Sequence, residues 1–354
     1  MTRPLDDVDR ALIHLLQLAP RISWTEAGRI LGLSATAVAT RWKSLLDQGS
    51  AWIALQPTTT GSHVTAIVEL TCTPSVRSDL LATLVDDGRL VSIEESSRGG
   101  DFVLTVMVPD PGALTTLILD DLPQREGVLT VRPSVVVKTL ATGSDWRLGV
   151  LSERQLAEAE RAGAPEGGGS IPLRDLTPLL DALAPDPRAS LADLARETGL
   201  TPATVRRRMQ ALLSGDHVTV RCDVAHADFG YPVTSAYFAQ VAPADMTRTI
   251  AGLRSLSMLR MCLQVTGEHN LIFSLLSPSV AGVAALQAAL GRHLPWVRIT
   301  ESRLILRTPK RMGWVLDAEG RPTGRVIPRV RVQEWRGGRR LGWMPRRRTQ
   351  EVHG

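Results

Sequence analysis

The strongest constraint on the fold is an internal repeat at a fixed offset of 167 residues. A repeat of this length determines the whole architecture, because each copy is one structural unit. The matching segments are Arg21-Ile22-Ser23 with Arg188-Ala189-Ser190, Gly32-Leu33-Ser34 with Gly199-Leu200-Thr201, and Gly100-Asp101 with Gly267-Glu268. The last pair lies far downstream of the others, so the repeat extends beyond one local motif. We therefore expect two copies of one unit to account for most of the chain.

Each copy opens with a helical half. In the first copy, the apolar stripe of Val8, Leu12, Leu15 and Ala19 predicts one helix that starts near residue 6. Ser23 with Glu26 has the capping-box spacing, which predicts a second helix over residues 24–31. Gly32 supplies a tight turn, and Ser34 caps a third helix over residues 35–47. Two short helices, a glycine turn and a capped third helix are typical of a helix-turn-helix.

The third helix of each copy has an apolar face that we assign to the core. The stripes are Val38, Trp42, Leu45 and Leu46 in one copy and Val205, Met209, Leu212 and Leu213 in the other, at the same offset. The opposite faces are polar and unlike each other. We therefore expect the polar faces to carry function and to differ between the copies.

Downstream of each helical half the apolar period changes from 3.6 to 2. Ala66, Val68, Leu70 and Cys72 alternate with polar neighbours, which predicts a strand with one buried face. The elements expected next are a helix at 75–87, strands at 90–97 and 102–108, a helix at 112–122 and a strand at 128–140. The second copy repeats this order, with strands near 235–241, 259–266, 270–276 and 297–307 and helices near 245–255 and 280–293. The fold class is therefore α+β, with two copies of a helix-turn-helix followed by a ferredoxin-like βαββαβ domain.

The expected divisions follow from these patterns. They are helix-turn-helix domains at 1–56 and 171–224, ferredoxin-like domains at 64–140 and 233–308, a linker at 141–170 and a basic tail at 309–354. Residues 149–170 end in Gly-Gly-Gly-Ser, and a flexible linker of that length reaches roughly 25 Å. We hypothesise that the two downstream domains pair within one chain as an intramolecular pseudo-dimer.

The unit resembles the Lrp/AsnC family of feast/famine transcription regulators. The resemblance rests on the opening Leu5-Asp6-x-x-Asp9-Arg10, on Arg21-Ile22-Ser23 and on Gly100-Asp101-Phe102, and it covers about residues 5–140 and 172–308. It implies a DNA-binding domain and a domain that dimerises and binds an amino acid or similar effector, with higher oligomers through the effector domains. The second copy departs from the pattern, because Ile171-Pro172-Leu173 replaces the charged opening and Glu268-His269 replaces the Asp-Phe turn.

Composition narrows the function classes. The chain is 44% hydrophobic and 22% charged, a globular balance. No apolar run approaches a membrane span and residues 1–9 lack a signal-peptide pattern, so we expect a cytoplasmic protein with no membrane partner. The histidines show no ligand spacing and the three cysteines are widely separated, so we expect no metal, no cofactor and cysteines that are buried apolar residues; a redox role for Cys72 or Cys262 stays open.

The net charge of +5 comes from the tail and cannot support DNA binding by the two units. Residues 309–354 carry 12 Lys plus Arg against 4 Asp plus Glu, whereas the first 308 residues carry 29 against 32. The tail is interpreted either as a basic arm that contacts phosphates or as a solubilising extension whose tryptophans pack on the sheet. The DNA hypothesis therefore depends on where basic residues lie in the third helices.

Major-groove recognition needs donors near the start of the third helix and flanking cations for phosphates. The candidates are Ser34, Thr36, Thr40, Arg41 and Lys43 in the first copy and Thr201, Thr204, Arg206, Arg207 and Arg208 in the second. Arginines on an amphipathic helix are often only a solvated face, but the helix-turn-helix context favours double-stranded DNA as the partner. The unlike faces predict an asymmetric operator.

The turns at Gly100 and Gly267 allow two interpretations. They are either hairpins that serve only the structure or sites that contact an effector. By family resemblance the effector pocket lies near this turn at a subunit interface. The candidates are Ser97, Arg98, Gly100 and Asp101 with Thr266, Gly267, Glu268 and His269. An acidic side chain suits an α-amino group and His269 suits a carboxylate, so the effector is expected to be an amino acid or a related metabolite.

An enzyme alternative comes from fold alone. The siroheme decarboxylases share the helix-turn-helix plus βαββαβ architecture, and two-unit forms are known among them. Such an enzyme would need basic or histidine residues that converge on a tetrapyrrole, and His226 and Tyr231 are the nearest candidates. The basic outward helices favour regulation, so we predict a regulator with no catalytic residues.

Overall fold

The computed structural model describes residues 4–57, 63–98, 100–143, 145–164, 171–214 and 218–327. The elements of the first unit are α1 (Asp7–Leu18), α2 (Trp24–Leu31), α3 (Ala35–Asp47), β1 (Ala51–Pro57), β2 (Val64–Cys72), α4 (Arg77–Val85), β3 (Leu90–Ser96), β4 (Phe102–Val108), α5 (Pro111–Thr115) with a following π-helical turn (Thr116–Asp121), and β5 (Val128–Ala141). The fold class predicted from the sequence is confirmed.

The second unit repeats the order of the first. Its elements are α7 (Leu173–Leu183), α8 (Leu191–Thr198), α9 (Pro202–Ser214), β6 (Val218–Val224), β7 (Val233–Gln240), α10 (Met246–Arg254), β8 (Leu259–Val265), β9 (Leu271–Ser277), α11 (Val280–His293) and β10 (Arg298–Arg311). Between the units lies α6 (Glu153–Gly163), and the chain continues after β10 into β11 (Trp314–Leu316) and β12 (Pro322–Val326).

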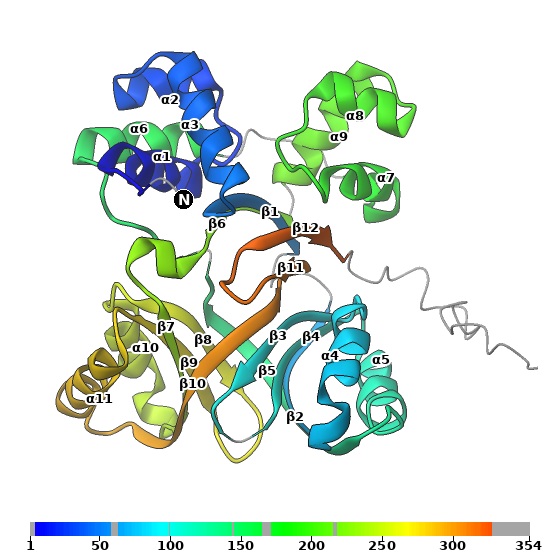
Figure 1. Cartoon of the computed structure of the whole chain (residues 1–354), viewed down its shortest axis with the longest axis vertical. Coiled ribbons are helices and arrows are strands. Elements are labelled where there is room, and N and C mark those ends of the chain that lie inside the picture. The colour runs from blue at the N-terminus through cyan, green and yellow to red at the C-terminus, as the bar shows by residue number, and fades with distance from the viewer. Residues whose placement is uncertain are drawn as a thin grey trace, which may run out of the picture.

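The strands of the two ferredoxin-like domains form one closed ring in the order β10-β3-β4-β2-β5-β8-β9-β7, because β10 also pairs with β7. The long last strand of each unit makes this possible. The first half of β5 pairs with β2 and its second half with β8, while β10 pairs first with β7 and then with β3. Each last strand thus joins its own sheet to the other unit's sheet within one chain (Figure 1).

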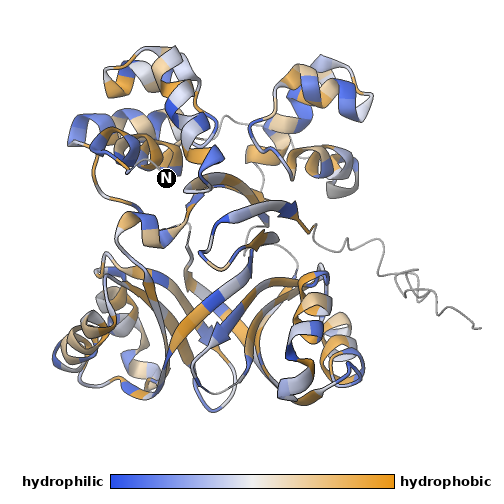
Figure 2. Cartoon of the chain, in the orientation of Figure 1, coloured by the Kyte–Doolittle hydropathy of each residue, from blue (hydrophilic) through white to orange (hydrophobic). Residues whose placement is uncertain are grey.

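Helices cover the outside of this barrel, and apolar side chains from both units fill the inside. α4 and α5 pack on the first unit's strands, and α10 and α11 pack on the second unit's strands. The inner cluster is Ile67, Ala236, Phe238, Leu263, Val265 and Ile272. The β2 residues that were predicted to be buried, Ala66, Val68, Leu70 and Cys72, are buried. Ile67 lies on the opposite face of the strand and is buried as well, because that face lines the barrel interior. Apolar residues dominate the barrel strands in Figure 2.

The helical halves follow the predicted capping chemistry. The side chains of Ser23 and Ser34 accept hydrogen bonds from the backbone of Glu26 and Ala37, and so cap α2 and α3. Gly32 and Gly199 both have left-handed backbones, with φ of 72° and 67°, which glycine adopts without steric cost. The predicted helix-turn-helix geometry is therefore present in both copies.

An antiparallel ribbon of β1 and β6 joins the two helical halves above the barrel (Figure 1). In this ribbon Ala54 pairs with Arg221, which is its own counterpart at the offset of 167 residues. The pseudo-twofold relation between the units therefore passes through this pair. The ribbon fixes the two helical halves in related positions.

Residues 141–170 are not a purely flexible linker, which corrects the prediction for this segment. Ser152 and Gln155 form a capping box that starts α6, and α6 packs on α1 and α2. Trp146 is buried in the core of the first helical half. Residue 144 and the glycine-rich end at 165–170 lie outside the described residues.

The first part of the basic tail forms a hairpin of β11 and β12 that docks between the layers. Trp314 packs on Trp52 of β1, with ring centroids 6.3 Å apart. Arg321 of the same hairpin pairs with Asp228 at 2.8 Å. The contact between Trp314 and Trp52 agrees with the interpretation in which tail tryptophans pack on the fold. Residues 328–354, which hold the remaining arginine clusters, lie outside the described residues.

Candidate nucleic-acid interface and effector turns

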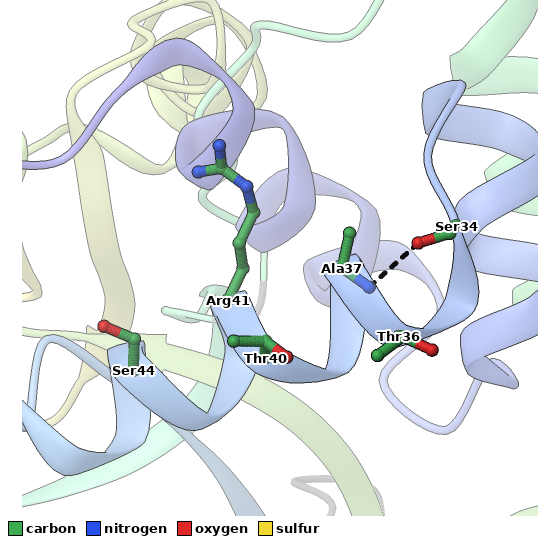
Figure 3. A pocket seen from close by; sticks show the side chains of 6 residues that line it. All are labelled: Ser34, Thr36, Ala37, Thr40, Arg41 and Ser44. Atoms are coloured by element: carbon green, nitrogen blue, oxygen red, sulfur yellow. Dashed lines mark hydrogen bonds between the residues drawn. The ribbon is translucent and has the colours of Figure 1, made fainter.

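The outward face of α3 is polar and mostly uncharged. Ser34, Thr36, Ala37, Thr40, Arg41 and Ser44 line a shallow hollow along it (Figure 3). Ser34 is engaged as the cap, since its Oγ accepts a hydrogen bond from the Ala37 backbone at 3.1 Å. Thr36 and Thr40 are exposed and sit on successive turns, so their hydroxyls can reach a base edge or a phosphate.

Arg41 is not free on the outward face, which corrects the sequence-based assignment. Its Nη1 donates to Asp6 Oδ2 at 2.7 Å and to Asp9 Oδ1 at 2.9 Å, both from the start of α1. Asp9 is wholly buried. Although partial burial opposes the effect, the hydrogen bond from Arg41 helps to lower the pKa of Asp6 to about 2. Arg41 therefore ties α3 to α1.

Lys43 remains exposed but pairs along its own helix. Its Nζ lies 2.7 Å from Asp47 Oδ2, one turn later. A pair of this kind at the surface contributes only tenths of a kcal/mol, so it does not prevent Lys43 from reaching a phosphate. The first copy thus presents one accessible cation beside two hydroxyls.

The second copy presents much more charge. Thr201 caps α9, since its Oγ accepts from the Thr204 backbone at 3.3 Å and also bonds the Thr204 hydroxyl. Arg206 and Arg207 are exposed and Arg208 is half-buried. Among the described residues no carboxylate pairs with any of these three arginines.

The difference between Arg41 and Arg208 has a clear cause. They occupy the same position in the two copies, but leucines stand where the first copy has Asp6 and Asp9. The counterpart of Asp9 is Leu176, which is wholly buried in the second helical core. The second copy therefore lacks the two ion pairs that join Arg41 to the first helix, and Arg208 has no counterpart of them among the described residues.

A pair of arginines that sequence reasoning missed holds the helical halves together. Arg21 donates to the backbone carbonyls of Pro187 and Ala189, and Arg188 donates to those of Pro20 and Ile22. The guanidinium of Arg188 also lies 3.8 Å from the centre of the Trp24 ring. The exchange is reciprocal at the offset of 167 residues. The recurrence of Arg21 as Arg188 in the sequence is the signal that indicates this pair.

Both predicted effector turns lie at the seams between the two units. Ser97 exchanges hydrogen bonds with Leu304 of β10, and Thr266 exchanges them with Val135 of β5. The seam position agrees with the expected interface. Several polar groups at these turns, however, already make structural bonds.

In the first turn, Asp101 is held by its own unit. Its carboxylate accepts from the Cys72 backbone at 2.7 Å and pairs with Arg77 at 2.8 Å. A Cβ at Gly100 would approach the Leu70 carbonyl to 3.2 Å, so close packing explains this glycine. Arg98 is exposed, and its carbonyl accepts from the Ser96 hydroxyl.

In the second turn, Gly267 adopts a φ of 117°, which side chains rarely tolerate. His269 Nδ1 lies 2.8 Å from the Thr300 hydroxyl, and its ring packs edge-on against Phe238. Glu268 uses its carbonyl to accept from Gln240 and leaves its carboxylate exposed. The two turns therefore offer different chemistry.

Titratable residues elsewhere give no sign of a metal centre in the described ranges. No group of three or more potential ligands converges among the described residues. The three cysteines are buried as predicted, and burial raises the pKa of Cys262 to about 12. Within the described part of the chain no helix is long and apolar enough to cross a membrane.

Comparison with known proteins identifies the helical halves. The AsnC-type helix-turn-helix domain matches residues 5–46 and again residues 178–213. The transcriptional regulator AzlB of Bacillus subtilis is 27% identical over 144 residues, which are 38% of this chain and 90% of that protein. The regulatory protein AsnC of Escherichia coli is 23% identical over 133 residues, which are 37% of this chain and 88% of that protein.

The two-unit arrangement is matched by a solved enzyme structure. The siroheme decarboxylase NirDL superposes with a TM-score of 0.57 and covers 86% of this chain and 93% of its own, at 12% identity. That similarity shows a shared fold. The tandem arrangement of two units is therefore present in the fold of that enzyme as well. Over one unit the chain is therefore similar to the Lrp/AsnC regulators, and an AsnC-type helix-turn-helix match stands at the head of each unit.

Proposed function

We propose that the protein is a sequence-specific DNA-binding transcriptional regulator whose two fused units act together as an intramolecular pseudo-dimer. The observation that carries this proposal is the surface of α9, where Arg206 and Arg207 are exposed, Arg208 is half-buried, and none of the three has a carboxylate partner among the described residues. The same helix belongs to a matched AsnC-type domain. Cations at that position of a helix-turn-helix suit DNA phosphates.

The two copies divide the task unequally in this proposal. α3 offers Thr36 and Thr40 with only Lys43 as an accessible cation, so it contributes base-edge contacts more than charge. α9 supplies most of the phosphate binding. A chain with unlike recognition helices on a pseudo-twofold frame should prefer an asymmetric operator.

Regulation by a small effector is part of the same proposal. The turns at Gly100 and Gly267 lie at the seams of the barrel, where a ligand would change the fit of one unit against the other. An amino acid is the class that their acidic side chains and His269 suit best, and the unlike chemistry of the turns predicts unequal affinities.

The surroundings of His226 and Tyr231, the candidate residues of the enzyme alternative, do not favour it. His226 and Tyr231 both pack edge-on against Trp146, at ring-centroid distances of 5.5 and 6.0 Å. His226 is buried, so its own ring offers no open face to a large flat substrate. NirDL has been solved with an iron-uroporphyrin III analogue, and siroheme is therefore the substrate to test against this chain.

The test is capture of sheared genomic DNA by the full chain, followed by sequencing of the retained fragments. We expect a discrete set of sites with an asymmetric consensus, and loss of retention in the Arg206→Gln, Arg207→Gln, Arg208→Gln triple variant. The exposed Arg292→Gln change is the control and should retain DNA. Uniform recovery of the genome, or a change in the absorption of siroheme on incubation with the protein, would contradict the proposal.

A further inference from the structure

A cluster of arginines lies between the β1–β6 ribbon and the barrel, away from both sites described above. Arg221 comes from β6, Arg260 from β8 and Arg311 from the end of β10, and Arg147 follows β5. Within the described ranges, the carboxylates inside this arginine cluster are Asp223 and Glu94. Asp145 acts on Arg147 from an exposed position where it bonds Thr142. Four cations thus face two enclosed anions.

The geometry shows that one carboxylate serves two of the arginines. Asp223 Oδ1 lies 2.6 Å from Arg221 Nη2 and 3.6 Å from Arg260 Nη2. Arg311 donates to the Val224 carbonyl at 3.2 Å instead of to an acid. Neither Arg260 nor Arg311 therefore uses its full donor capacity within the described structure.

The arginines also crowd one another. A Cβ on Gly143 would lie 1.0 Å from Arg260 Nη1 and 2.6 Å from Arg221 Nη1. Arg260 Nη1 and Arg221 Nη1 are therefore at most about 3.6 Å apart. Like charges at that separation, away from bulk water, repel strongly, and the single carboxylate of Asp223 beside them can offset only one of the two charges.

The electrostatics of the neighbours agree with unbalanced positive charge. Burial, reinforced by the charges of Arg221 and Arg311, lowers the pKa of Arg260 to about 9. Burial raises the pKa of Glu94, which weakens it as a counter-ion. Burial and the same arginines hold the pKa of His226 well below its usual value, so His226 stays neutral. Its buried Nε2 has no hydrogen-bond partner in the described structure.

We propose that the arginine cluster binds a small divalent oxyanion, with inorganic phosphate as the reference ligand. An excess of two positive charges matches a dianion, and planar guanidinium groups bind tetrahedral oxyanions through paired hydrogen bonds. The Arg260 side chain is only 14% exposed, so its charge is largely shielded from bulk water. The proposal does not depend on DNA binding.

The position of this site gives the ion a structural consequence. Arg221 belongs to the ribbon that carries the helical halves, whereas Arg260 and Arg311 belong to the barrel. An ion held by all three would bridge the DNA-binding layer and the barrel. Occupancy should therefore stabilise the full chain against thermal unfolding.

The test is equilibrium dialysis of labelled phosphate against the full chain, with thermal unfolding followed in parallel at constant ionic strength. We expect one saturable site per chain and a rise in Tm that saturates over the same concentrations. Arg260→Gln and Arg311→Gln should each weaken binding at least tenfold. The Arg206→Gln, Arg207→Gln, Arg208→Gln variant and Arg292→Gln should bind phosphate as the unchanged protein does.

Three results would overturn the proposal: no retained phosphate, retention that does not saturate, or equal binding by the unchanged protein and both cluster variants. The dialysis stoichiometry of the unchanged protein stands even if a cluster variant fails to fold, and circular dichroism identifies that case. DNA retardation of the same preparations is measured separately, so failure of the anion site and failure of the regulator proposal are distinguishable.

Discussion

Replacing Arg41 and Arg208, which occupy equivalent positions in the two third helices, by methionine should have opposite consequences. Arg41 lies 2.9 Å from the wholly buried Asp9 and 2.7 Å from Asp6. Removing the cation from a buried carboxylate costs about 3 kcal/mol of stability. Arg208 has no such partner in the described chain, so Arg208→Met should change the free energy of unfolding by less than about 0.5 kcal/mol.

The DNA readout should show the reverse pattern. Losing one phosphate contact lowers the slope of log affinity against log salt by about 0.9, so the penalty of raising salt from 50 to 200 mM shrinks about threefold. We expect this change in Arg208→Met and not in Arg41→Met. Urea unfolding is followed by tryptophan fluorescence, to which Trp24 and Trp42 of the first helical half contribute, and affinity by DNA retardation across a salt series. If Arg41→Met keeps its unfolding midpoint and flattens the salt slope, Arg41 contacts DNA and the tether argument is wrong.

Three further predictions use other contacts. Burial lowers the pKa of His14 to about 4, and its Nδ1 accepts from the backbone before α6. Because the folded pKa lies below the unfolded value, up to about 3 kcal/mol of stability should be present above pH 6.5 and be lost towards pH 4. In the His14→Gln variant, the free energy of unfolding should therefore depend less on pH over this range. Arg21→Ala and Arg188→Ala each remove two carbonyl contacts between the helical halves, so each should weaken DNA binding without changing the salt slope, and an altered slope in retardation assays would contradict this. Trp314→Ala should lower the free energy of unfolding by about 3 kcal/mol in urea titration by opening a cavity at the ribbon; an unchanged midpoint would show that the hairpin is not needed there.

The sequence predicted the elements well because local signals and core burial agree in this chain. The stripe of α3 and its Ser34 cap lie where the pattern placed them, and α11 has the predicted bounds. What the pattern could not supply was the pairing between units. The second halves of β5 and β10 alternate no differently from the first halves, yet they pair with the other unit. Long-range strand partners leave no periodic trace in one sequence.

The contacts made by the candidate site residues could not be predicted for a related reason. Helical spacing places Arg41 on a polar face, but it does not reveal that Asp6 and Asp9 come within reach after folding. Ser34 and Thr201 were assigned to DNA, and their side chains serve as helix caps. The arginine cluster was missed entirely, because its members come from segments that meet only in three dimensions. Neither net charge nor spacing signals such a meeting.

The unequal charge of the two recognition helices can be tested by adding charge as well as by removing it. Thr40 is exposed and corresponds to Arg207 at the offset of 167 residues, so Thr40→Arg gives α3 the cation that α9 already has. If α3 lies against the DNA backbone, the new arginine should steepen the salt slope by about 0.9 and tighten binding most at low salt. Discrimination among operator sequences should fall at the bases that Thr40 contacts, because a phosphate contact carries no base information. Selection of binding sites by both proteins measures this directly. An unchanged slope with unchanged specificity would show that α3 does not contact DNA, and that α9 acts alone.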